Sequence, residues 1–114
     1  MLDYRNKGYL IQIIQFCDRL EKLLDNISKD EYDDNLDYKE IACFNLIQIG
    51  ELATKLSDDF VKEYNQISWK LVKGMRNIIV HNYGSIDYDI VWETSKKNIK
   101  ELSLYCNNIL KQNV

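Results

Sequence analysis

The sequence predicts an all-α fold, an antiparallel bundle of four main helices plus a short helix, in a single domain over residues 1–114. Three observations support this prediction. The chain has no proline and only four glycines, so long helices can form without losing an interior backbone donor. Its apolar residues recur at steps of three and four, the period of a helix with one buried face. Its 114 residues suffice for one hydrophobic core and are too few for two.

The first long helix is expected from about Asp3 to Asn26, because one apolar stripe follows that segment. Ser28 and Glu31 then match a capping box, in which each side chain satisfies a backbone donor of the other residue. The acid-rich segment that follows, as far as Asp37, is interpreted as a loop or a short helical turn. The stripe consists of Leu10, Ile13, Ile14, Cys17, Leu20, Leu24 and Ile27.

The second helix is expected from Asp37, which repeats the start signal together with Glu40, to about Leu56. Gly50 lies inside this helix. A glycine in a helix interior costs about 1 kcal/mol relative to alanine, so close packing against another backbone is the expected compensation. The expected inner face consists of Ile41, Phe44, Ile47 or Gln48, Leu52 and Leu56.

A short helix is expected after Ser57 and a third main helix after Ser68, because both serines can cap the residues that follow. Gly84 is expected to end the third helix. Asp87 is the expected cap of the fourth, which runs from about Tyr88 to Lys111. The expected core residues are Leu71, Val72, Met75, Ile78 and Ile79 in the third helix, and Ile90 or Val91, Ile99, Leu102, Tyr105 or Cys106, and Ile109 in the fourth.

Charge is distributed unevenly along the chain. The formal charge is −3 and the isoelectric point is near 5.1, so bulk electrostatics disfavour a protein that coats nucleic acid, and no DNA partner is expected. Residues 64–86 nevertheless contain no acidic residue, whereas Lys70, Lys73 and Arg76 supply positive charge. A phosphate-bearing ligand is expected at this stretch, with Lys73 as a supporting contact. The alternative is a chance cluster on a solvated face.

Cysteine and histidine usage disfavours a metal centre. The three cysteines lie far apart among apolar residues, and the single histidine cannot complete a zinc set, so free buried thiols, no metal and no cofactor are expected. The sequence has neither a signal-peptide pattern nor an apolar run near the ~18 residues of a membrane span. A cytoplasmic protein without membrane contact is therefore expected.

The residues that can carry chemistry gather around His81. An imidazole has an ordinary pKa near ~6.5, so it can give or take a proton at neutral pH. Arg76, five residues earlier, offers a fixed cationic fork that suits a phosphate. One proton shuttle and one phosphate clamp are the minimum for metal-independent RNA cleavage, in which the 2′-hydroxyl attacks its own phosphodiester. By spacing alone, His81 could equally be a capping or packing residue.

Helical geometry separates the two groups. At about 100° per residue, Arg76 and His81 lie about 140° apart around one straight helix, whereas Asn77 and His81 share a face. Either the helix unwinds near Asn82, or a second copy of the chain completes the site across a two-fold axis. We favour the second solution, a homodimer with a composite site.

Several short segments occur in an order that is specific for one family. Their centre is Arg76-x4-His81, with the polar Asn77 after the arginine and Tyr83 two residues after the histidine. The others are Ile47–Glu51, Lys55–Ser57, Ile67–Trp69, Gly74–Asn77, Val80–Tyr83, Ile86–Asp87 and Trp92. Over roughly residues 8–110 the chain thus resembles the HepT family of HEPN proteins, the toxins of prokaryotic HepT/MntA toxin–antitoxin modules. Asn65-Gln66 replaces a proline that family members often carry there.

The resemblance implies a HEPN-like helical bundle that forms dimers, places the motifs of both chains in a shared cleft and cuts RNA without a metal ion. It also implies a partner, a minimal nucleotidyltransferase that serves as the MntA-like antitoxin. This partner transfers AMP to the motif tyrosine, which is Tyr83 here. An AMP group beside Arg76 would occupy the position of the substrate phosphate.

Four residues keep more than one interpretation. Tyr83 could be an ordinary tyrosine at a helix end. Glu51 could be a buried acid that faces and supports the motif, or a plain surface residue. Trp69 and Trp92 are expected to anchor the core or an interface, although stacking on RNA bases is physically available to them.

Two functions remain open from the sequence. The leading hypothesis is an endoribonuclease toxin with Arg76 as phosphate clamp, His81 as proton shuttle and Asn77 as the residue that orients them. The alternative is a non-catalytic HEPN module that binds a nucleotidyltransferase partner or a nucleotide, and whose motif holds a phosphate without cutting RNA.

Overall fold

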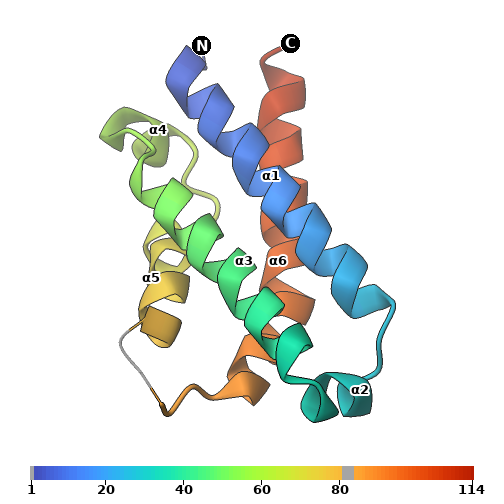
Figure 1. Ribbon diagram of the computed structural model, residues 1–114. Helices are drawn as coiled ribbons and strands as arrows, with labels where there is room; N and C mark the ends of the chain where they lie inside the picture. Colours follow the sequence, from blue (N-terminus) through green and yellow to red (C-terminus); the bar gives the residue numbers. More distant parts are fainter. Residues whose placement is uncertain (1, 81–83) are drawn as a thin grey trace.

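The chain folds into six helices in a computed structural model that describes residues 2–80 and 84–114 (Figure 1). Four long helices and two short ones follow one another, so the expected all-α bundle is confirmed, with one short helix more than expected. In chain order they are α1 (Tyr4–Asp25), α2 (Lys29–Asp34), α3 (Leu36–Thr54), α4 (Asp58–Glu63), α5 (Trp69–Val80) and α6 (Tyr88–Gln112).

All helix starts but one follow the predicted capping signals. The exception is α3, which is capped by Asn35 rather than Asp37, because the Asn35 side chain accepts a hydrogen bond from the Asp37 amide. Asp3 accepts a hydrogen bond from the Arg5 amide, and Ser57 and Asp87 cap α4 and α6 in the same manner. The Ser68 hydroxyl accepts from the Leu71 amide, 3.3 Å away, and so caps α5. These side chains satisfy backbone donors that have no partner inside the helix.

Of the two interpretations of the acid-rich segment after α1, a loop or a short helical turn, the structure shows the helical one, the six-residue helix α2. Both bonds of its capping box are present, from the Glu31 amide to the Ser28 hydroxyl and from the Ser28 amide to the Glu31 carboxylate. Tyr32 fastens α2 to the body of the protein, because its buried ring packs on Trp92 and its hydroxyl donates to the Tyr88 carbonyl at 2.8 Å.

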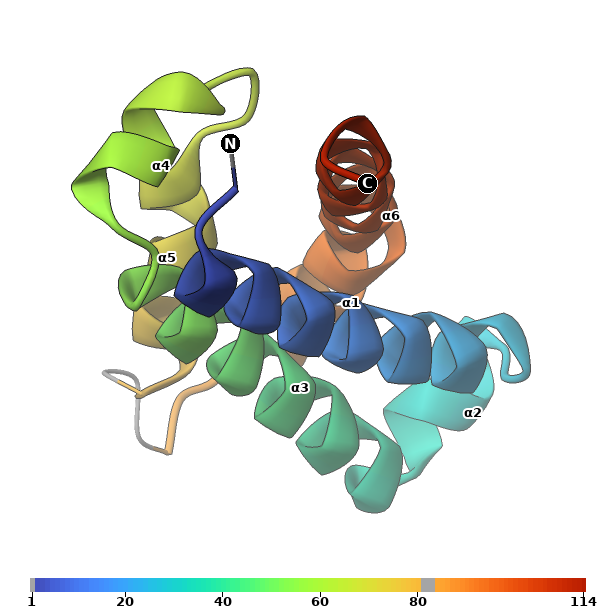
Figure 2. The same cartoon turned by 90° about the horizontal axis from the view of Figure 1, so that it is seen from above.

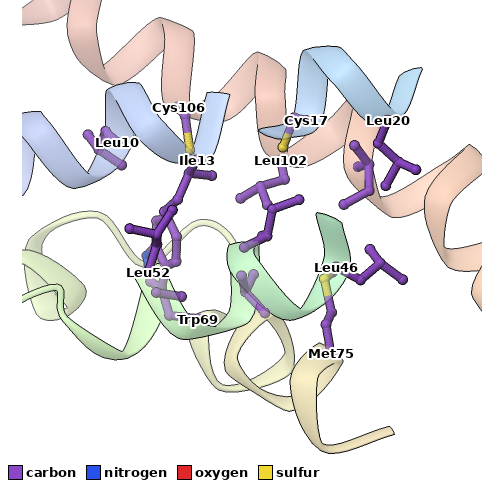
Figure 3. Packing of buried hydrophobic residues seen from close by; sticks show 14 of the residues in the cluster. Leu10, Ile13, Cys17, Leu20, Leu46, Leu52, Trp69, Met75, Leu102 and Cys106 are labelled. Atoms are coloured by element: carbon purple, nitrogen blue, oxygen red, sulfur yellow. The ribbon is translucent and has the colours of Figure 1, made fainter. Parts of the chain in front are cut away.

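The helices pack around a core to which α1, α3, α5 and α6 all contribute. Helix α1 lies against both α3 and α6, and α5 lies against the far side of α3 (Figures 1 and 2). Figure 3 shows side chains from these four helices meeting, among them Ile13, Leu52, Trp69 and Leu102. The fully buried members include Leu10, Ile13, Cys17, Leu20, Ile49, Ile99, Leu102 and Cys106.

The expected inner face of α3 is wrong in part. Ile41 and Phe44 are 46% and 56% exposed, although both belong to the predicted stripe. Helix α3 is apolar on nearly every side, so helical periodicity alone could not decide which side faces inward. The side that packs inward consists of Ala42, Cys43, Asn45, Leu46, Ile49, Gly50, Leu52 and Ala53.

Smaller differences concern the other helices. Leu71 is 70% exposed rather than buried, since it lies on the rim of an open groove of about 340 Å³ between α5 and α6. In α6 the alternatives are resolved, since Val91 rather than Ile90, and Cys106 rather than Tyr105, face the core of the protein. The expectation for the Ile78 side chain lies outside what the structure describes. Gly84 has a positive φ of 75°, a backbone conformation that suits glycine. Its predicted role in ending the third helix depends on residues 81–83, which lie outside the described residues.

Candidate functional site

Helix α5 carries the arginine of the motif, and α3 holds it in place. The Arg76 side chain is 36% exposed, and its Nε lies 2.8 Å from Oε1 of Glu51. Asn77, the next residue, is exposed, and Lys73, nearly one turn earlier, is half-buried. Arg76 and Glu51 therefore meet at the α3–α5 contact, whereas Asn77 lies on the exposed side of α5. His81 and Tyr83 lie outside the described residues, so their expected roles stay predictions.

The backbones of α3 and α5 approach each other closely at Gly50. A Cβ added there would lie 2.9 Å from the Arg76 Cβ, 3.0 Å from the Arg76 amide nitrogen and 3.3 Å from the Lys73 carbonyl oxygen. These distances leave no room for a side chain, which confirms that Gly50 packs against another backbone. Gly50 thus brings α3 close to α5, and the next residue, Glu51, is then within reach of the arginine.

The ion pair orients Arg76 more than it stabilises the fold. Both side chains are more than one third exposed (36% for Arg76 and 42% for Glu51), so solvent screening limits its contribution to about 1 kcal/mol or less. A guanidinium has five N–H donors, and even a two-point pair with one carboxylate would leave three of them. Arg76 can therefore be held by Glu51 and still bind a phosphate. Glu51 is thus neither buried nor a plain surface residue, since it is a half-exposed acid paired with Arg76.

The two tryptophans are anchors within the protein, as expected. Trp69 is 2% exposed, and its indole N–H donates to the Tyr64 carbonyl at 2.7 Å. Trp92 is half-buried, with its ring 4.8 Å from that of Tyr32. A base could not stack on Trp69 without opening the core. Lys96 lies over the Trp92 ring and beside Asp25, away from the motif helix.

The cysteines offer no nucleophile. All three are free and buried. Burial raises the pKa of the Cys43 thiol to about 11 and that of the Cys106 thiol to about 12, and it raises the pKa of Cys17 further. A thiol that stays protonated at neutral pH is a poor nucleophile and a poor metal ligand. Within residues 2–80 and 84–114, no group of three or more His, Cys, Asp or Glu side chains could hold a metal ion.

None of the helices, over the parts of the chain that the structure covers, is both long enough and apolar enough to span a membrane.

Comparison with known proteins gives a consistent match over nearly the whole chain. The family model described as "Ribonuclease HepT-like" matches residues 13–109. "Putative RNase MJ1216" of Methanocaldococcus jannaschii is 31% identical over 107 residues, which cover 92% of this chain and 87% of that protein. "Putative RNase TTE0752" of Caldanaerobacter subterraneus is also 31% identical, over 93% of this chain and 95% of its own.

A third relative carries the family's own name. "Probable ribonuclease HepT" of Thermococcus cleftensis is 25% identical over 99 residues, which cover 85% of this chain and 88% of that protein. No solved structure matches this chain.

Proposed function

The chain belongs to the HepT-like ribonuclease family, and from this premise we propose that it is the RNA-cleaving toxin of a HepT/MntA-type toxin–antitoxin module. The observation that carries the proposal is Arg76, a half-exposed arginine that Glu51 and Gly50 fix in position without covering it. The ribonuclease names of the relatives support the same activity. We also propose that the protein acts in the cytoplasm, where its RNA substrates are.

In the proposed reaction the RNA supplies its own nucleophile. His81 accepts the proton of a 2′-hydroxyl while that oxygen attacks the adjacent phosphorus. The bond from phosphorus to the 5′-oxygen breaks, and the protonated His81 returns the proton to this leaving oxygen. The products are a 2′,3′-cyclic phosphate and a 5′-hydroxyl end. Arg76 stabilises the negative charge that builds on the phosphoryl oxygens, and no metal ion is needed.

The neighbours of Arg76 have supporting roles in this proposal. Glu51 is a positioning residue, since it contacts the guanidinium rather than the RNA. Asn77 orients the reacting groups from the same face as His81. Lys73 adds positive charge beside the bound phosphate. A homodimer, in which each chain contributes Arg76 and His81 to one composite site, would overcome the separation of about 140° between these residues on a straight helix.

Regulation by AMP transfer is part of the proposal. The phenolic oxygen of Tyr83 would attack the α-phosphorus of ATP on a minimal nucleotidyltransferase, the antitoxin, with pyrophosphate as the leaving group. The attached AMP would place a phosphate within the electrostatic reach of Arg76 and so exclude the substrate. Intact mass after co-expression should show addition of AMP, and Tyr83→Phe should abolish it. An unchanged mass of the wild type would contradict this part.

Cleavage of RNA in the presence of a chelator tests the activity. Wild type should cut RNA and leave 5′-hydroxyl ends, whereas Arg76→Ala and His81→Ala should each lose cleavage. Arg5→Ala is the matched control, because Arg5 is an exposed arginine on α1. If wild type leaves RNA intact while still binding a nucleotidyltransferase or a nucleotide, the protein is a non-catalytic module and the nuclease proposal is wrong.

A further inference from the structure

Helix α5 has one face that no other part of the chain covers within residues 2–80 and 84–114. We call it the open face of α5 and define it as Lys70, Lys73, Gly74 and Asn77. Lys70 and Asn77 are exposed, and Lys73 and Gly74 are partly exposed. The face lies in the acid-free stretch of residues 64–86, although the chain as a whole has a net charge of −3.

The cations of α5 form one row that ends at the candidate site. Lys70, Lys73 and Arg76 are three residues apart, so each lies about 60° around the helix from the last and about 4.5 Å further along it. The row therefore winds from the open face towards the contact with α3. A strand with one phosphate at Arg76 could meet Lys73 and then Lys70 with its next phosphates.

The two lysines have charge to offer to a ligand. In the parts of the chain that the structure covers, no ion pair reaches Lys70 or Lys73, whereas Lys29, Lys96 and Lys100 are paired with aspartates. Glu51 is the acid that α3 brings to this region, and it pairs with Arg76. Glu101 of α6 lines the groove on the other edge of α5, beside Leu71.

Gly74 leaves the helix backbone of this face open to a ligand. A Cβ at Gly74 would meet no atom within 4 Å, so nothing in the described chain requires a glycine there. Glycine is a poor helix former, and Gly74 lies inside α5. The backbone of α5 explains Gly50, whereas no contact among the described residues explains Gly74 or Gly8. A glycine also allows a ligand to approach the helix backbone directly.

We propose that the open face of α5 binds the sugar–phosphate backbone of single-stranded RNA next to the phosphate held by Arg76, with Gly74 as the point of closest approach. This inference rests on the proposed ribonuclease function. The face has cations and an amide but no aromatic side chain, so it suits phosphates and sugars rather than stacked bases. Its contacts should therefore be largely independent of base sequence. The row spans only seven residues, about 9 Å of helix, which suits a few nucleotides of one strand.

The salt dependence of binding tests the lysines. The affinity of the His81→Ala protein for a fluorescent oligouridylate is measured over a range of KCl concentrations, so that cleavage does not interfere. Adding Lys70→Gln and Lys73→Gln should reduce the slope of log K against log salt by about 0.7 for each lysine. Lys22→Gln with Lys111→Gln is the matched control, because both lysines are exposed and lie on α1 and α6. The control should keep the wild-type slope.

Two glycines provide a test that is insensitive to stability. Gly74→Ala and Gly8→Ala both place a Cβ in open space inside a helix, so neither should lower the melting temperature. Gly74→Ala should nevertheless weaken RNA binding about tenfold, because a methyl group blocks the close approach. Gly8→Ala, on α1, should bind like wild type.

The outcomes separate this inference from the proposed function. If wild type cleaves RNA but the Gly74 and lysine variants bind it normally, the inference is wrong and the nuclease proposal stands. If Gly74→Ala changes the mass in solution by light scattering while RNA binding is unchanged, the face contacts a second copy and the inference is again overturned. If wild type binds RNA through these residues without cutting it, only the nuclease proposal fails. Absence of RNA binding overturns both.

Discussion

Replacing Gly50 by alanine isolates the close approach of α3 to α5. The new Cβ would lie 2.9 Å from the Arg76 Cβ, 3.0 Å from its amide nitrogen and 3.3 Å from the Lys73 carbonyl oxygen. None of these atoms is the end of a flexible side chain, so the two helices must move apart. Overpacking of this kind costs about 1–3 kcal/mol, while the better helix propensity of alanine returns about 1 kcal/mol.

The free energy of unfolding of Gly50→Ala should therefore fall by up to about 2 kcal/mol relative to wild type. Gly8→Ala is the control, because its Cβ meets nothing within 4 Å and only the helix propensity changes. Urea titration followed by circular dichroism should separate the two variants by about 1–3 kcal/mol. For 114 residues, each kcal/mol corresponds to about 4 °C in melting temperature.

The same substitution should also impair RNA cleavage, since Arg76 is displaced together with the backbone of α5. Stability and activity can be told apart by assaying well below the melting temperature of the variant. If Gly50→Ala is as stable as Gly8→Ala within about 0.5 kcal/mol, the two backbones are not in contact at this point. The argument that Gly50 positions the arginine would then be wrong.

Three further changes test other parts of the structure. Glu51→Gln should change the free energy of unfolding by no more than about 1 kcal/mol. It should lower kcat/KM for RNA about ten- to a hundredfold, mainly through kcat, because Arg76 loses its orientation. A normal kcat would show that Glu51 does not position Arg76. Tyr32→Phe should destabilise the fold by about 1 kcal/mol, because the Tyr88 carbonyl loses a hydrogen bond. An unchanged melting temperature would show that this hydrogen bond does not stabilise the attachment of α2. A thiol reagent at mildly alkaline pH should leave the native protein unmodified, because burial raises the pKa of each thiol and the groups stay protonated. In concentrated guanidinium chloride all three thiols should react. Rapid reaction of the native protein would contradict the burial of Cys17, Cys43 and Cys106.

Much of the fold could be predicted from the sequence because its signals are local. Caps such as Ser28, Ser57, Ser68 and Asp87 bond to amides two or three residues away, so a short segment contains the whole interaction. The apolar stripe of α1 has polar residues on the other sides, which gives it one possible inner face. The starts of α1, α2, α4, α5 and α6 and the packing of α1 followed from such evidence, whereas α3 is capped by Asn35 rather than by the predicted Asp37.

Features that depend on distant partners could not be derived in the same way. Helix α3 is apolar on several sides, and only the positions of α1 and α5 decide that Leu46 faces inward and Phe44 outward. Leu71 is exposed because α5 and α6 leave a groove between them, and nothing in the residues around Leu71 indicates this. The contact of Glu51 with Arg76 joins residues 25 positions apart, so the sequence could only leave it open.

The attachment of Arg76 to α3 has a consequence for ligand affinity. A long side chain that is free in solution loses rotamer freedom when it binds, at a cost of about 0.5–1.5 kcal/mol for each side chain immobilised. Here the fold restrains the guanidinium before any ligand arrives, so part of that entropy loss belongs to folding instead of to association. An incoming anion thus meets a preorganised receptor, and a lysine at the same position, with a flexible stem and no planar fork, would not reproduce it.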